Sequence, residues 1–110
     1  MADSTAPFVV LHHETLEAAM LLIEENRHRS VVVVDEAGVV VGTLSDGDAR
    51  KAILDRRLLS TSVEQVMNTN FVALGPDERG RAKEFFERDH LFLVPIVDAD
   101  GKLLVVEAAY

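Results

Sequence analysis

The residues with the clearest chemical potential lie in one short segment, Gly42-Thr43-Leu44-Ser45-Asp46-Gly47-Asp48. Glycine at positions 42 and 47 lets a ligand approach the backbone, because glycine has no Cβ. The Ser45 hydroxyl and the free amides at the start of a following helix suit a phosphate group. The Asp48 carboxylate can accept hydrogen bonds from both hydroxyls of a ribose. The segment therefore has the groups needed to hold a phosphorylated ribose.

The same segment has an equally good structural interpretation. Ser45 and Asp48 are three residues apart at a predicted helix start, which is the spacing of a capping box. Such a cap contributes about 1 kcal/mol to helix stability. Asp46-Gly47-Asp48 also has the D-x-D pattern of a hard-cation site, but the sequence places no third carboxylate beside it. We predict no metal here, and the segment alone leaves ligand binding and helix capping open.

The elements around this segment occur twice in the chain. Residues 8–38 align without a gap on residues 71–101, which lie 63 positions later. A unit of this size cannot bury its apolar face alone, so we expect the two copies to pack on each other and to form paired clefts. The alignment keeps Phe8/Phe71, Val9/Val72, Leu11/Leu74, Ala19/Ala82, Glu24/Glu87, Val31/Val94, Val34/Val97, Asp35/Asp98 and Gly38/Gly101.

Hydrophobic periodicity predicts the order strand, helix, strand, strand, helix in the first copy. We expect a strand at 8–11, a helix from Thr15, a hairpin of strands at 31–34 and 39–44, and a second helix from Ser45 to about Leu58. In the linker that follows, Ser62 and Gln65 have the spacing of a capping box for a short helix ending near Met67.

The second copy is expected to repeat this order and to stop before its last helix. Its strands are predicted at 71–74, 91–97 and 102–106, and its helix near Pro76. Arg79 and Lys83 replace the apolar Leu16 and Met20 of the first helix, which predicts a helix that packs differently or is more exposed. The predicted fold is α/β (α+β), with two β-α-β-β-α units related by a pseudo-twofold axis: residues 1–62, and residues 63–110 as a truncated or degenerate copy.

The complete pattern resembles the CBS domain family. The turn Val33-Val34-Asp35-x-x-Gly38 returns as Ile96-Val97-Asp98-x-x-Gly101, and the first copy continues as Gly-x-x-Ser-x-x-Asp. Family members pair two units into a Bateman module that typically binds adenosine nucleotides in clefts between the units. The resemblance implies that Ser45 and Asp48 contact phosphate and ribose, with Gly42, Thr43, Asp46 and Gly47 beside them, and that the backbone near Val9, Val10, Val31 and Val32 lies along the base.

The second copy departs from the family pattern. Val105-Val106-Glu107-Ala108 stands where the first copy has Gly42-Thr43-Leu44-Ser45, so the resemblance implies one strong nucleotide site per chain. The segment 42–54 also looks like CBS pairs attached to sugar-nucleotidyltransferase-like proteins, and somewhat less like those attached to sugar-phosphate isomerases. The implied partner is therefore a catalytic domain in cis or in trans.

Other polar residues have modest interpretations. Adjacent His12 and His13 would bind a metal only with distant partners, so we expect an exposed polar turn. His28 and His90 are predicted to lie at helix ends. Arg50 and Lys51 are weaker candidates for a phosphate contact, and solvated surface positions suit them better.

Composition excludes several function classes. The chain has 110 residues, no cysteine and a formal net charge of −8. This length suits one compact domain and is too short for a catalytic domain plus a regulator. The acidic balance argues against a nucleic-acid surface, and the apolar runs are too short to span a membrane. With no signal-like start, a cytoplasmic location is expected.

These observations predict a regulatory module and not an enzyme. The sequence has no P-loop and no nucleophile paired with a base. We expect it to sense AMP, ADP, ATP or a related nucleotide as a regulatory ligand, with no obligatory cofactor, and to form a homodimer through apolar residues such as Ile53, Leu54, Leu58 and Leu59. The alternatives are a purely structural dimerisation module and the regulatory part of a sugar-phosphate isomerase.

Overall fold

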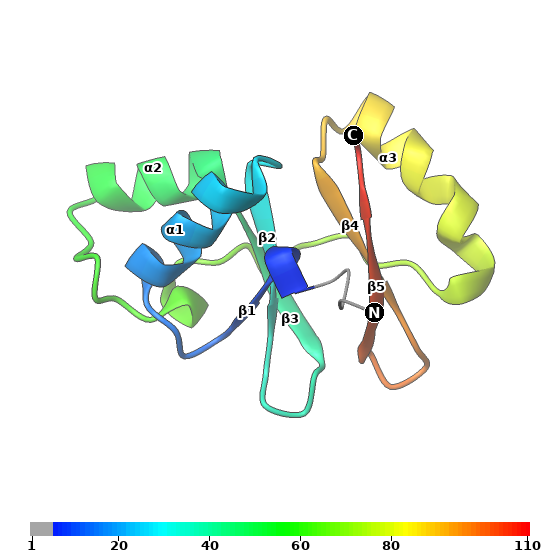
Figure 1. Ribbon diagram of the computed structural model, residues 1–110, viewed down its shortest axis with the longest axis horizontal. Coiled ribbons are helices and arrows are strands. Elements are labelled where there is room, and N and C mark those ends of the chain that lie inside the picture. The colour runs from blue at the N-terminus through cyan, green and yellow to red at the C-terminus, as the bar shows by residue number, and fades with distance from the viewer. Residues whose placement is uncertain (1–5) are drawn as a thin grey trace.

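The computed structural model describes residues 6–110, which form two units side by side (Figure 1). The sheets of the two units face each other at the centre, and the helices cover the outer faces. The predicted α/β architecture is therefore confirmed. The elements are η1 (Ala6–Phe8), β1 (Val9–Leu11), α1 (Leu16–Asn26), β2 (Ser30–Val34), β3 (Val40–Ser45), α2 (Asp46–Leu54), η2 (Val63–Gln65), η3 (Pro76–Arg81), α3 (Ala82–Arg88), β4 (Leu93–Val97) and β5 (Leu103–Ala108).

The first unit is built around β2, whose five residues are all buried. This strand pairs in parallel with β1 and antiparallel with β3. Its β-branched valines suit a strand that is covered on both faces. The side chain of Thr15 caps α1 by accepting from the amide of Ala18, as expected for a helix that begins after Thr15. Helix α1 then buries Leu16, Ala19 and Ile23 on the sheet.

The second unit has a two-stranded sheet of β4 and β5, so the predicted strand at 71–74 is wrong. Only Leu74 forms a bridge, with Ile96. Continuing this parallel pairing toward residue 72 would require an amide hydrogen on Pro95, which proline lacks. The predicted exposed helix is confirmed, because Arg79 and Lys83 are exposed and Ala82 is the buried residue of α3.

The two hairpin turns are built in the same way, 63 residues apart. The Oδ1 atom of Asp35 accepts from the amides of Ala37 and Val39 at 2.9 and 3.0 Å. Asp98 does the same for Asp100 and Lys102. Each turn ends in a glycine with positive φ, 86° at Gly38 and 83° at Gly101, which is a conformation that side chains other than glycine rarely adopt.

The units are joined by reciprocal backbone hydrogen bonds between these hairpins. The amide of Val40 donates to the carbonyl of Gly101 at 3.0 Å, and the amide of Leu103 donates to the carbonyl of Gly38 at 2.9 Å. Exchanging the units exchanges these two bonds, as a pseudo-twofold axis requires. Around them lies an apolar cluster shared by both units, with these buried members: Val32, Val34, Val40 and Leu93.

Two predicted local details are wrong. Helix α2 ends at Leu54 and not near Leu58, because Arg56 adopts a left-handed φ of 67°. The amide of Arg57 then reaches back to the carbonyl of Ala52, which closes the helix. The linker element η2 is a 3₁₀ turn without a capping box, since Ser62 instead donates its hydroxyl to the carbonyl of His12.

The linker packs with the first unit. Val63 is fully buried in the apolar cluster beneath α1 and α2, together with half-buried Val66 and Met67. The division of the chain at residue 62 stays a prediction. Within residues 6–110, no helix has the length and apolar character needed to cross a membrane.

We predict opposite effects for alanine at two glycines of the segment 42–48. A Cβ at Gly42 would lie 2.6 Å from Sδ of Met67 and 3.1 Å from the carbonyl oxygen of Asn68, so Gly42→Ala should destabilise the protein by about 1–3 kcal/mol. A Cβ at Gly47 meets nothing closer than 3.7 Å, so Gly47→Ala should stabilise α2 by about 0.5–1 kcal/mol.

Urea unfolding followed by circular dichroism would measure both changes. The chain has no tryptophan, so the helical signal is the suitable probe. Equal stability of the two variants would show that the linker is not held against β3 at Gly42.

Candidate functional site

A cleft of about 270 Å³ lies between the two units, which makes it the best candidate for a ligand site. The first unit contributes Ser30, Thr43, Ser45 and Asp48 to its lining. The facing wall comes from the linker and the second unit: Asn68, Asn70, Phe71, Val72, His90, Leu91, Phe92 and Leu93. A polar wall therefore faces a largely apolar one, which suits a ligand with an apolar face and a polar edge.

Ser45 and Asp48 form the predicted capping box at the start of α2. The amide of Asp48 donates to Oγ of Ser45, and the amide of Ser45 donates to Oδ2 of Asp48, both at 3.0 Å. In the described part of the chain, Oδ1 of Asp48 has no hydrogen-bond partner, and the residue is half-buried at the cleft. The cap thus fixes the Asp48 side chain and still leaves one carboxylate oxygen for a ligand.

The remaining predicted site residues divide by location. Gly42 is buried against Met67, and Gly47 lies exposed on α2. Asp46 points to Arg50, 3.5 Å away, so the two carboxylates of Asp46-Gly47-Asp48 serve different partners. None of these lines the cleft. The binding roles assigned to them stay predictions.

The valines predicted to lie along the base also lie outside the cleft lining. Val10 and Val31 belong to the apolar cluster of the first unit. Val32 is a buried member of the cluster shared by the units, and half-buried Val9 packs against it. At the cleft, Val72 holds the position that corresponds to Val9 in the second copy. The repeat was the sequence signal that could have identified this wall.

The linker residues of the cleft are held by pairing with β3. The amide of Asn68 donates to the carbonyl of Thr43 at 2.7 Å, and the amide of Thr43 donates back at 3.0 Å. The side chain of Asn68 accepts from the amide of Asn70. His90 reaches the cleft from the end of α3 with a left-handed φ of 57°. His28 also follows a helix end, as predicted, and its ring stacks on Tyr110.

The cleft lining carries few charges. Asp48 and His90 are its titratable residues, and no lysine or arginine is among the lining residues. Lys51 and Arg57 line an adjoining hollow of about 310 Å³ on the other side of Asp48. An anionic group in the cleft therefore depends on neutral donors such as the Ser45 hydroxyl.

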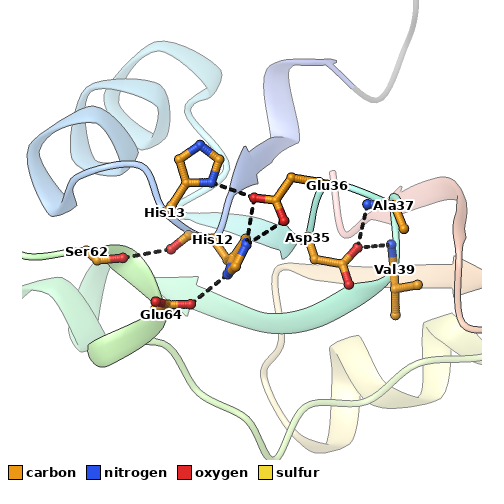
Figure 2. A network of polar contacts seen from close by, with 8 residues as sticks. All are labelled: His12, His13, Asp35, Glu36, Ala37, Val39, Ser62 and Glu64. Carbon is orange, nitrogen blue, oxygen red and sulfur yellow. Dashed lines mark hydrogen bonds and ion pairs between the residues drawn. The ribbon is translucent and has the colours of Figure 1, made fainter.

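A second polar cluster lies on the first unit, where His12 contacts Glu36 and Glu64 (Figure 2). Hydrogen bonds that His12 donates to the Glu64 and Glu36 carboxylates raise its pKa above the ordinary value. In turn, the hydrogen bond from His12 lowers the pKa of Glu36. The predicted exposed turn is confirmed for His13, whereas His12 is half-buried and has the distant partners that the sequence did not reveal.

Comparison with known proteins identifies the family of the fold that forms this cleft. Residues 3–55 match the family model described as "CBS domain". The chain belongs to the CBS domain family. The model covers the first unit, and solved CBS-domain structures resemble nearly the whole chain. A putative acetoin utilization protein (AcuB) from Vibrio cholerae aligns over 96% of this chain and 78% of its own, with a TM-score of 0.81 and 24% identity.

Two further relatives bear on ligand and context. The CBS domain protein PAE2072 from Pyrobaculum aerophilum, solved in complex with AMP, aligns over 98% of this chain and 82% of its own, with a TM-score of 0.75 and 18% identity. Arabinose 5-phosphate isomerase GutQ from Salmonella typhi is 34% identical over 98 residues, which are 88% of this chain and 30% of the isomerase. This CBS chain thus spans about a third of that relative. The predicted association with nucleotidyltransferases is not supported, because the matched GutQ proteins are arabinose 5-phosphate isomerases.

Proposed function

We propose that this CBS chain is a regulatory module that binds an adenosine-type nucleotide in the cleft between its units. The observation that carries the proposal is the position of Asp48, whose Oδ2 is held in the helix cap while Oδ1 is left without a partner in the described chain. A carboxylate fixed in this way can accept the hydroxyls of a ribose without first losing side-chain freedom. No chemical step is assigned to the module.

The lining favours a nucleotide of low charge. Phe71, Val72 and Phe92 offer apolar area for a base, whereas the Ser45 hydroxyl offers a donor for one phosphate. Additional phosphates would lie near the Asp48 carboxylate without a lysine or arginine in the cleft lining. AMP should therefore bind more tightly than ATP. The AMP complex of the Pyrobaculum relative supports this choice.

The regulated partner in this proposal is a sugar-phosphate isomerase domain, in the same chain or a separate one. The support is the similarity to arabinose 5-phosphate isomerase GutQ, of which the matched region is 30%. Occupancy of the cleft would change the relative position of the two CBS units, and a domain attached to either unit would sense that change. A cytoplasmic location agrees with such a partner.

The alternative function is a dimerisation module without a ligand, and one surface favours a dimer in either case. Apolar side chains cluster at the end of α2 and just after it, with these exposed fractions: Ile53 44%, Leu54 75%, Leu58 71% and Leu59 45%. Exposed apolar groups of this kind are typical of a protein interface. A homodimer through this surface is compatible with nucleotide binding and does not depend on it.

The role of Asp48 can be separated from its role in the cap. Asp48→Asn keeps an oxygen that can accept from the Ser45 amide, so the melting temperature should change little. The side chain then turns an amide group toward the ribose and loses the charged acceptor. Hydrogen bonds to charged groups contribute about 1.5–3 kcal/mol, so the affinity for AMP should fall at least tenfold in isothermal titration, with one site per chain in the wild type.

Asp77→Asn is the matched control, because it makes the same charge change at an exposed residue outside the cleft lining and outside the predicted site. Its AMP affinity should equal that of the wild type. Thermal melting with AMP, ADP, ATP and S-adenosylmethionine would rank the ligands, since a ligand of the folded state raises the melting temperature. Equal affinities of the two variants would limit Asp48 to helix capping, and the absence of any shift would favour the dimerisation module.

The dimer is a separate prediction. Light scattering should give twice the 12.1 kDa chain mass at micromolar concentration. The double variant Leu54→Ser, Leu58→Ser should shift the mass toward the monomer, because both side chains lie in the exposed apolar surface. Leu104→Ser removes an exposed leucine from β5 and should leave the dimer intact. A monomeric wild-type protein would contradict the prediction.

A further inference from the structure

The cluster around His12 combines side chains from three separate segments (Figure 2). His12 and His13 lie in the turn between β1 and α1, Glu36 lies in the turn between β2 and β3, and Glu64 lies in η2. The cluster is at the end of β2 that carries Val34, whereas the cleft is at the Ser30 end. With about 3.3 Å per strand residue, the two places are roughly 15 Å apart.

Three nitrogen and oxygen atoms of this cluster face one another. Nε2 of His12 and Nδ1 of His13 lie 3.0 and 2.8 Å from the same atom, Oε2 of Glu36. One ligand atom from each of these residues lies within 4.8 Å of the others. In a tetrahedral zinc site with bonds of about 2.0–2.1 Å, neighbouring ligand atoms are ~3.3 Å apart. A small rotation of exposed side chains would therefore admit an ion among them.

Glu64 sets the orientation of the His12 ring. Its Oε2 lies 2.6 Å from Nδ1 of His12, so this nitrogen carries a hydrogen and donates it. In the protonated ring Nε2 donates to the Glu36 carboxylate, and in the neutral ring the Nε2 lone pair, aimed at the same place, can bind a metal ion. A carboxylate behind a ligating histidine is a common outer partner in metal sites, where it fixes the ring and raises its basicity.

The backbone around the cluster is firmly held. The amide of His12 donates to the carbonyl of Val34 at 2.8 Å. The carbonyl of His12 accepts from the amide of Glu64 at 3.0 Å and from the Ser62 hydroxyl at 2.9 Å. The turn that carries Glu36 is closed by the Asp35 side chain. The ligand side chains thus start from fixed positions, which lowers the cost of ordering them around an ion.

The second unit shows whether the hairpin turn itself needs His12, His13 and Glu36. It forms the same hairpin turn, but it has none of the three candidate ligands. The positions 63 residues after His12, His13 and Glu36 hold Gly75, Pro76 and Ala99. The hairpin turn therefore forms without this cluster.

We propose that His12, His13 and Glu36 form a binding site for a divalent transition-metal ion, with zinc as the best-suited ion and Glu64 as the outer partner of His12. Two imidazoles and one carboxylate are the donor set of zinc sites that keep an open position. The side chains of His13 and Glu36 are 53% and 67% exposed, which leaves the fourth position to water. Magnesium and calcium prefer all-oxygen shells and fit this set poorly.

Isothermal titration of the metal-free full chain with zinc chloride tests the site without a nucleotide. One zinc per chain should bind, and excess magnesium should not compete. Glu36→Gln and His13→Gln each remove a direct ligand and should weaken binding at least a hundredfold. Glu64→Gln should weaken it by about 10–100-fold, the range for outer partners. Cobalt should bind in place of zinc and give the visible absorption of a site with imidazole ligands.

Glu25→Gln is the matched control, because Glu25 is an exposed residue of α1 with the same charge change as Glu36→Gln. Its zinc affinity should equal that of the wild type. Circular dichroism would show that each variant is folded, and Glu36 lies in an exposed turn where the change is tolerated. The proposal is overturned if no saturable one-to-one binding occurs, or if Glu36→Gln and Glu25→Gln bind zinc equally well.

Discussion

The inner faces of the two hairpins can be buried only against each other, and the rest of the structure depends on this constraint. The cluster shared by the units contains Val32, Val34, Val40 and Leu93, and the reciprocal bonds between residues 38–40 and 101–103 fix its register. Neither the three-stranded sheet of the first unit nor the two-stranded sheet of the second could cover these side chains by itself. The cleft lies at the Ser30 end of β2, away from the hairpin turns along which the units are hydrogen-bonded.

Asp48 illustrates how one side chain can serve stability and binding together. The cap requires a side-chain acceptor oxygen at the third position of α2, and the proposed ribose site requires a carboxylate at the cleft. Because the helix begins at the edge of the cleft, the same residue satisfies both, with a different oxygen for each. Ser45 also lies at the cleft while its hydroxyl accepts from the Asp48 amide. A capping motif in a sequence is therefore compatible with a ligand site.

The elements of the first unit could be predicted because their signals are local. Valine runs, the Thr15 cap and the Asp35 to Gly38 turn each act within a few residues. The errors involve partners distant in sequence or unusual backbone. Helix α2 ends where Arg56 adopts the left-handed conformation. This conformation is usually taken by glycine, so the sequence carries no signal for the helix end here. The loss of the strand at 71–74 depends on Pro95, which becomes relevant only after the pairing is known.

The candidate sites follow the same rule. Ser45 and Asp48 were predictable from spacing, but the facing wall requires knowledge of how the copies dock. The contacts of His12 with Glu36 and Glu64 span 24 and 52 residues, so adjacent histidines alone could not indicate them. These contacts meet at the beginning of the linker, whose Asn68 pairs with Thr43 and lines the cleft. The linker is thus held to the first unit at both ends, near Glu64 and at Asn68. Only three residues, Gln65, Val66 and Met67, separate these two contacts, and Val66 and Met67 pack on the apolar cluster of the first unit.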